Sequence, residues 1–196
     1  MVSVGLLIVR VAVGLMMAAH GTQKLFGWFG GYGLQKTGDF FAQLGFRPGR
    51  ALAAAASLSE IAGGLLIALG LLGPIGPALI LSVMIVAAVT VHWGHGFFAT
   101  TNGIELPLLY SVAAIGLALT GPGPYSLDAV LGLEGVWTTA TTWIVLGLGA
   151  LGAFIVIMVR SEKRRTARGP TGPLRTGHAR PDLVECRGLV ERRGRV

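Results

Sequence analysis

The sequence predicts an all-α, polytopic membrane protein: a four-helix transmembrane bundle with a fifth, peripheral transmembrane helix. Of its 196 residues, 53% are hydrophobic and only 13% are charged, whereas soluble domains usually contain about 25% charged residues. Long apolar stretches recur along the chain and are separated by breaks rich in glycine and proline, such as residues 73–77. Stretches of about 20 apolar residues are long enough to cross a bilayer as helices.

The predicted organisation has three parts. Residues 1–133 form a membrane domain, residues 134–160 add a further transmembrane helix, and residues 161–196 form a basic tail. The tail is rich in Gly, Pro and Arg, so we expect it to be disordered. Within the membrane domain, spans are predicted at about residues 4–26, 50–72, 77–95 and 104–120. A short amphipathic helix at about residues 34–46 is predicted to lie in the membrane interface, with a loop as the alternative.

Two local patterns refine this organisation. Asn102 is followed three residues later by Glu105, which resembles a capping box and predicts a helix start at this point. The apolar stretch within residues 134–160 carries no charge. It therefore offers the bundle interior no polar partner, and we expect it at the edge of the bundle.

The charge distribution predicts the orientation in the membrane. Most of the 16 Lys and Arg residues lie from Arg160 onward, and four more surround the first predicted loop, whereas the loop after residue 120 is acidic. Basic flanks are retained in the cytoplasm, so we expect a plasma-membrane protein with its N-terminus outside and its tail inside. The basic tail is read as a topology signal, and no nucleic-acid partner is expected. A single cysteine, Cys186, excludes a disulfide within the chain.

A polar stripe interrupts the first predicted span. Arg10, His20 and Lys24 fall on one side of a helical wheel, and such a stripe should face other helices, a cavity or a ligand instead of lipid. The predicted topology brings the ends of three spans together on one side of the membrane. We therefore expect His20, Lys24, His92 and Glu105 to converge on one polar cavity there, with His95 beside them.

Arg10 and Glu60 are predicted to lie deeper in the membrane. Unpaired charges within spans are costly, so we expect Arg10 and Glu60 to form an intramembrane ion pair. The alternative for Glu60 is a proton carrier.

Three interpretations of the polar residues stay open at this point. The histidines His20, His92 and His95 could bind a metal ion or haem, although their spacing alone is weak evidence. The cluster could form a pocket for a quinone or another small ligand, in which a histidine donates to a carbonyl oxygen. It could also be a polar network that only holds the helices together.

Several segments resemble the DoxX family of small bacterial membrane proteins. They are HGTQKLFG at 20–27, SEIAGGLLIALGL at 59–71, HWGHGFF at 92–98, NGIELPLL at 102–109 and GPGPYSLD at 121–128. The resemblance implies a four-helix membrane bundle associated with redox systems. It carries over to Arg10, His20, Gly21, Lys24, Glu60, Gly63, Gly64 and Glu105, where the glycines are expected to allow close helix packing. It assigns no catalytic residue.

These observations predict an accessory subunit of a quinone-linked membrane redox system, with membrane lipid and other protein subunits as partners. No self-sufficient catalytic motif is present, and quinone is the candidate cofactor. The alternatives are a carrier or channel for a small solute and an assembly scaffold without chemistry of its own.

Overall fold

The computed structural model describes residues 1–160, which are helical and contain no strand. The all-α prediction is therefore confirmed for this part of the chain. The prediction of a disordered basic tail falls on residues 161–196, outside the described residues. The helices are α1 Val2–Phe26, η1 Trp28–Gly30, α2 Gly33–Gln43, α3 Gly49–Leu69, α4 Ile75–Ala87, η2 Ala88–His92, η3 Trp93–His95, η4 Ala99–Thr101, α5 Glu105–Thr120, α6 Leu127–Val130, η5 Glu134–Val136 and α7 Thr139–Met158.

Four helical segments of residues 1–160 are long and apolar enough to cross a membrane. They are α1, α3, α7 and the continuous segment Ile75–His95 that joins α4 to η2 and η3. Helix α5 is equally apolar but has 16 residues, which corresponds to about 24 Å at 1.5 Å per residue. This is shorter than the hydrocarbon core of about 30 Å. The chain is thus a multi-pass membrane protein, as predicted.

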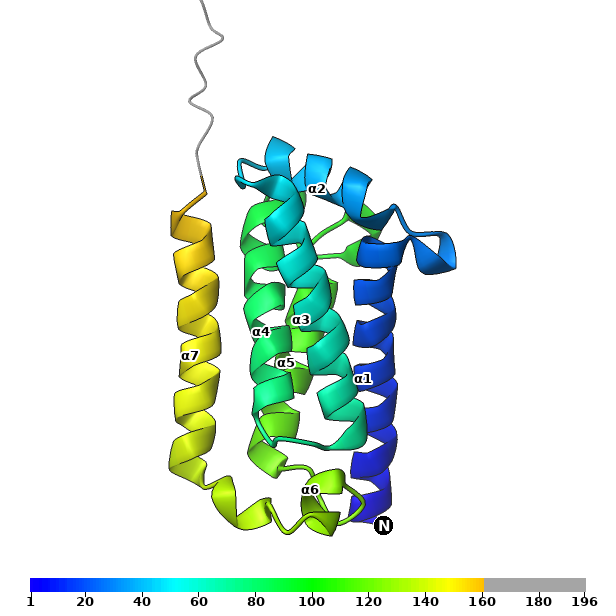
Figure 1. The fold of residues 1–196 in the computed structure, drawn as a ribbon, viewed down its shortest axis with the longest axis vertical. Helices are drawn as coiled ribbons and strands as arrows, with labels where there is room; N and C mark the ends of the chain where they lie inside the picture. Colours follow the sequence, from blue (N-terminus) through cyan, green and yellow to red (C-terminus); the bar gives the residue numbers. More distant parts are fainter. Residues whose placement is uncertain (161–196) are drawn as a thin grey trace, which may run out of the picture. The chain divides into compact units, whose positions relative to one another are not determined.

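The long helices alternate in direction, which gives the bundle two distinct ends (Figure 1). Helix α2 crosses one end, where α1, α4 and α7 finish and α3 and α5 begin. We call this the α2 end. The N-terminus, the turn between α3 and α4, and α6 lie at the opposite end, which we call the α6 end.

Helices α1 and α3 make the closest contact in the bundle, because small residues line both of them. A Cβ atom added to Gly14 would lie 2.5 Å from the carbonyl oxygen of Gly64, and one added to Gly21 would lie 2.6 Å from that of Ser57. Gly63 approaches α4 in the same way, since its Cβ would lie 3.0 Å from the carbonyl oxygen of Gly76. Small residues allow such contacts in lipid, where no hydrophobic effect drives helices together.

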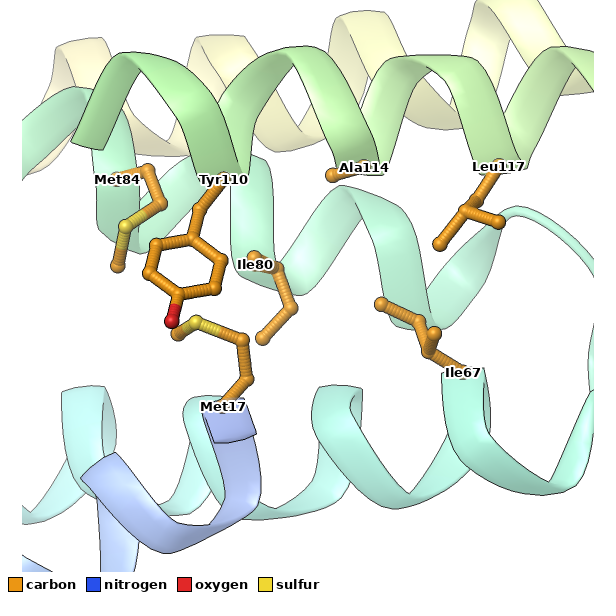
Figure 2. Packing of buried hydrophobic residues seen from close by; sticks show 7 residues of the cluster. All are labelled: Met17, Ile67, Ile80, Met84, Tyr110, Ala114 and Leu117. Carbon is orange, nitrogen blue, oxygen red and sulfur yellow. The ribbon is translucent and has the colours of Figure 1, made fainter. Parts of the chain in front are cut away.

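The centre of the bundle is filled by side chains from α1, α3, α4 and α5 (Figure 2). Figure 2 shows the Tyr110 ring of α5 pointing across to Met17 of α1, with Ile80 of α4 beside them. The buried members of this cluster are Met17, Ile67, Ile80, Met84, Tyr110, Ala114 and Leu117. Its contacts hold α5 in the bundle even though α5 is short.

Helix α7 lies at the edge of the bundle beside α4 (Figure 1). Its Leu146 is buried against Ala78 and Leu81 of α4 and Ala118 of α5. A Cβ added to Gly149 would lie 2.7 Å from the carbonyl oxygen of Ala78. The peripheral helix is therefore packed closely against α4, but only along one side.

The predicted capping box before α5 is wrong. Asn102 adopts a left-handed conformation, with φ of 63°, and ends η4 instead of capping α5. The preceding segment folds back on itself, since the amide of Glu105 donates to the carbonyl of Phe97. This turns the Glu105 carboxylate toward the amide of Ala99, 2.7 Å away. The helix still begins at Glu105, as the position of the motif predicted.

Candidate functional site

Glu60 is the most deeply buried acidic side chain of the α2 half of the bundle. It lies on α3, is 0% exposed, and accepts a hydrogen bond from the ammonium group of Lys24 on α1. Its second oxygen, Oε2, has no hydrogen-bond partner within residues 1–160. The Lys24 side chain is 34% exposed. Lys24 therefore connects a fully buried carboxylate to a more open region.

The predicted ion pair between Arg10 and Glu60 is wrong. Gly14 lies opposite Gly64 and Gly21 lies opposite Ser57, so in this antiparallel pair Glu60 is level with Ala18. Lys24 is six residues from that level, about 9 Å, whereas Arg10 is eight residues away, about 12 Å. If Lys24 were level with Arg50, as expected for two basic residues at the same membrane boundary, Arg10 would lie only four residues from the level of Glu60.

The direction in which side chains lean on a helix also favours Lys24 over Arg10 as the partner of Glu60. Side chains on a helix lean toward its N-terminus. In an antiparallel pair, the side chains of Lys24 and Glu60 therefore lean toward each other, whereas those of Arg10 and Glu60 lean apart.

Arg10 instead stabilises the α6 end of the bundle. Its guanidinium group donates to the backbone carbonyls of Pro122 and Tyr125 in the segment after α5. Asp128, which is 0% exposed, accepts from the amides of Leu72 at 2.8 Å and Gly73 at 2.7 Å in the turn between α3 and α4. These bonds satisfy buried polar groups and tie the segment around α6 to the bundle.

A pocket of about 670 Å³ lies at the α2 end. Its wall is formed by the end of α1, by α2, α3, α4 and η2, and by Val156 of α7. Most of the wall is apolar. Its polar members are Lys24, Tyr32, Lys36, Thr37, Ser59, Ser82, Thr90 and His92. Pockets of about 300–1,000 Å³ with an apolar wall and few polar groups are typical of small-molecule sites.

The π-helical turn η2 carries three of these wall residues: Thr90, Val91 and His92. The Thr90 hydroxyl donates to the carbonyl of Val86 at 2.7 Å, so its proton is not free to bond a ligand. The Nδ1 atom of His92 lies 2.7 Å from the carbonyl oxygen of Asn102. π-Helical turns occur often at functional sites, and here the turn belongs to the wall of the pocket.

The structure brings only two of the four predicted residues to this pocket. Lys24 and His92 line it, but His20 and Glu105 are not part of its wall. The His20 ring instead packs edge-on against Tyr110, with 6.0 Å between the ring centroids. Glu105 is engaged by the backbone of the η4 loop, as described above. His95 also bonds locally, since its Nδ1 lies 2.9 Å from the carbonyl oxygen of Val91.

Metal binding by the histidines gains no support from the geometry. Within residues 1–160, no three His, Cys, Asp or Glu side chains are placed so that they could hold a metal ion. The Nδ1 atoms of both His92 and His95 are already occupied by backbone carbonyls.

Sequence reasoning missed the contribution of α2 to the pocket. Lys36, Thr37 and Phe40 of α2 line it, as does Tyr32 just before the helix, whereas the sequence predicts only an interfacial helix here. The available signal was that Lys36 and Phe40 are four residues apart and so share a face of the helix. Which element this face would cover was not readable from the sequence.

The chain was also compared with known proteins. Residues 5–93 match the family model DoxX. No curated protein and no solved structure matches the chain. The matched residues include Lys24, Glu60 and His92, and all of α2.

Proposed function

We propose that this multi-pass membrane protein, whose residues 5–93 match the DoxX family model, is an accessory subunit of a membrane redox system. In this role the pocket at the α2 end holds a membrane-soluble ligand with a polar head and an apolar tail. Quinones are the redox molecules with this general construction. The protein itself supplies binding and positioning.

The observation that supports this proposal is the make-up of the pocket wall. The polar side chains Lys24, Tyr32 and Lys36 come from the end of α1 and from the segment that crosses the end of the bundle. The wall also contains Val83, Val86 and Ala87 of α4, together with the hydroxyl groups of Ser59 and Ser82. A ligand that combines a polar head with an apolar tail would find both kinds of side chain in this wall.

His92 adds a specific preference. A carbonyl oxygen only accepts hydrogen bonds, so the Nδ1 atom of His92 must donate to Asn102. In the neutral imidazole this leaves Nε2 as an acceptor. His92 is therefore suited to receive a hydrogen bond from a hydroxyl group, such as that of a quinol. This differs from the sequence-based hypothesis, in which a histidine donates to a quinone carbonyl.

We also propose an orientation. Lys24, Lys36, Arg47 and Arg50 all lie at or near the α2 end, whereas Asp128 and Glu134 lie at the α6 end. The positive-inside rule then places the α2 end in the cytoplasm of the plasma membrane and the N-terminus outside. The pocket would face the cytoplasmic leaflet.

Purification from native membrane tests the function. The full chain, extracted in a mild detergent, should carry a co-purifying lipid-soluble ligand and a redox-enzyme subunit, both identifiable by mass spectrometry. Ala55→Phe should remove the ligand because Ala55 lines the pocket. Ala51→Phe, one turn earlier on α3 and outside the wall, should retain it. A ligand content that is equal in both variants, or solute flux through the protein in liposomes, would contradict the proposal.

A further inference from the structure

We propose that the pocket at the α2 end selects an amphiphile with an anionic head and a single long alkyl chain, such as a long-chain carboxylate. This inference rests on one part of the proposed function, namely that the pocket holds a membrane-soluble ligand with a polar head and an apolar tail, and it names a class of ligand other than quinone. It commits to a charged head, whereas quinones have a neutral one.

The charges on the pocket wall are the first observation that supports an anionic ligand. The wall contains two ammonium groups, those of Lys24 and Lys36, and no carboxylate. Lys24 is paired with Glu60, which is fully buried. Lys36 forms no ion pair with any group of residues 1–160. The wall therefore presents an uncompensated positive charge to whatever enters.

Lys24 can bind a ligand without leaving Glu60. An ammonium group has three N–H donors, and Glu60 takes one of them. The Lys24 side chain is one-third exposed and lines the pocket. Its remaining donors can reach an oxyanion, which makes Lys24 a bridge between the buried carboxylate and the head of the ligand. Tyr32 supplies a hydroxyl group in the same wall, whereas the Thr37 hydroxyl already donates to the backbone carbonyl of Lys24 at 3.3 Å.

The remainder of the wall fits a hydrocarbon chain. Apart from the polar side chains, the wall is apolar and includes Leu52 and Ala55 of α3, Val83 and Val86 of α4, and Val156 of α7. The hydroxyl groups of Ser82 and Thr90 lie on the α4 side of the wall, and the Thr90 hydroxyl is already bonded to its own helix. A volume of about 670 Å³ is in the range of single drug-sized ligands, so we assign one chain and not the two chains of a phospholipid.

The test uses the full chain in nanodiscs of phosphatidylcholine, a lipid without net charge. A photoreactive palmitate is compared with the matched photoreactive hexadecanol, at mildly alkaline pH, where the carboxylate is ionised and lysine is still charged. We expect the palmitate to label the α3 and α4 walls of the pocket and the alcohol to label them weakly. Mass spectrometry of the cross-linked peptides gives the position and the yield.

Two exposed basic residues form a matched pair for this experiment. Lys36→Gln removes a wall charge and should reduce palmitate labelling about tenfold, the loss expected for one hydrogen bond to a charged group. Arg47→Gln removes a charge at the same end but outside the wall and should leave labelling unchanged. Neither residue forms an ion pair within residues 1–160, so both variants should keep the thermal stability of the wild type. Hexadecanol labelling should not respond to either change.

The outcomes separate this inference from the proposed function. If a photoreactive quinone labels the pocket while palmitate does not, the anionic head is wrong and the lipid-soluble ligand stands. If neither labels it, both fail. Equal labelling by palmitate and hexadecanol, or equal losses in Lys36→Gln and Arg47→Gln, would overturn the charge selection. Displacement of palmitate by phosphatidylglycerol at equal mole fraction would overturn the single-chain assignment.

Discussion

Lys24 of α1 and Glu60 of α3 form a hydrogen-bonded ion pair between the two helices that make the closest contact in the bundle, and the same lysine lines the pocket at the α2 end. The pair neutralises a carboxylate that has no exposed surface. It also fixes the position of one ammonium group in the pocket wall. Helix packing and the candidate site therefore depend on the same two side chains.

Removing Lys24 alone should destabilise the protein more than removing both partners. Lys24→Met leaves Glu60 as a lone buried charge and should cost about 3 kcal/mol, whereas the double variant Lys24→Met/Glu60→Gln should recover much of that loss. A double-mutant cycle on unfolding in detergent measures the coupling. Arg10→Met combined with Glu60→Gln serves as the control, and coupling in that cycle would instead support a pair between Arg10 and Glu60.

Gly14→Ala should loosen the contact between α1 and α3. The added methyl group would lie 2.5 Å from the carbonyl oxygen of Gly64 and 2.6 Å from the amide nitrogen of Ala68, so the two backbones must separate. We expect a loss of about 1–3 kcal/mol, as for other overpacked sites, seen as a lower unfolding temperature in detergent. Gly147→Ala, with open space at its Cβ position, should be neutral. Similar losses in both variants would show that helix propensity or lipid contact governs the effect.

Asp128→Asn should open the α6 end without disturbing the α2 end. The carboxylate accepts from two backbone amides, and an asparagine amide offers only one oxygen. We expect a loss of about 2 kcal/mol, typical of a hydrogen bond to a charged group. Hydrogen exchange should increase around Leu72 and in α6. If hydrogen exchange around Leu72 and in α6 did not change, or if it increased equally in α2, Asp128 would not be a residue that stabilises only the α6 end.

Lys36 and Glu134 are expected to lie on opposite sides of the membrane. With Cys186→Ser as the background, Lys36→Cys should resist an impermeant thiol reagent in intact cells, and Glu134→Cys should react. The reason is that basic flanks are retained in the cytoplasm. The reverse pattern of labelling would place the pocket in the outer leaflet.

The sequence by itself determined the class of protein, since residues 1–160 are helical without strands and four of their segments can cross a membrane. Apolar length and glycine–proline breaks predicted the spans, because the hydrocarbon core requires about 20 apolar residues per helix. The polar stripe on the first span correctly indicated that Lys24 faces another helix, because a charge facing lipid is too costly. The segments at 20–27 and 59–71 that resemble the DoxX family lie within residues 5–93, which match the DoxX family model.

Only the tertiary structure decided which charges meet. The ion-pair partner of Glu60 depends on the register of α1 against α3, and that register is set by the close approach of Gly14 to Gly64 and of Gly21 to Ser57. If α1 slid along α3 by four residues, about 6 Å, Arg10 instead of Lys24 would be the residue closer to Glu60. Helical periodicity places side chains on a face, but it does not fix how far one helix slides along another. The pocket has the same origin, since it exists only where α2 crosses the end of the bundle and η2 adds His92 to its wall.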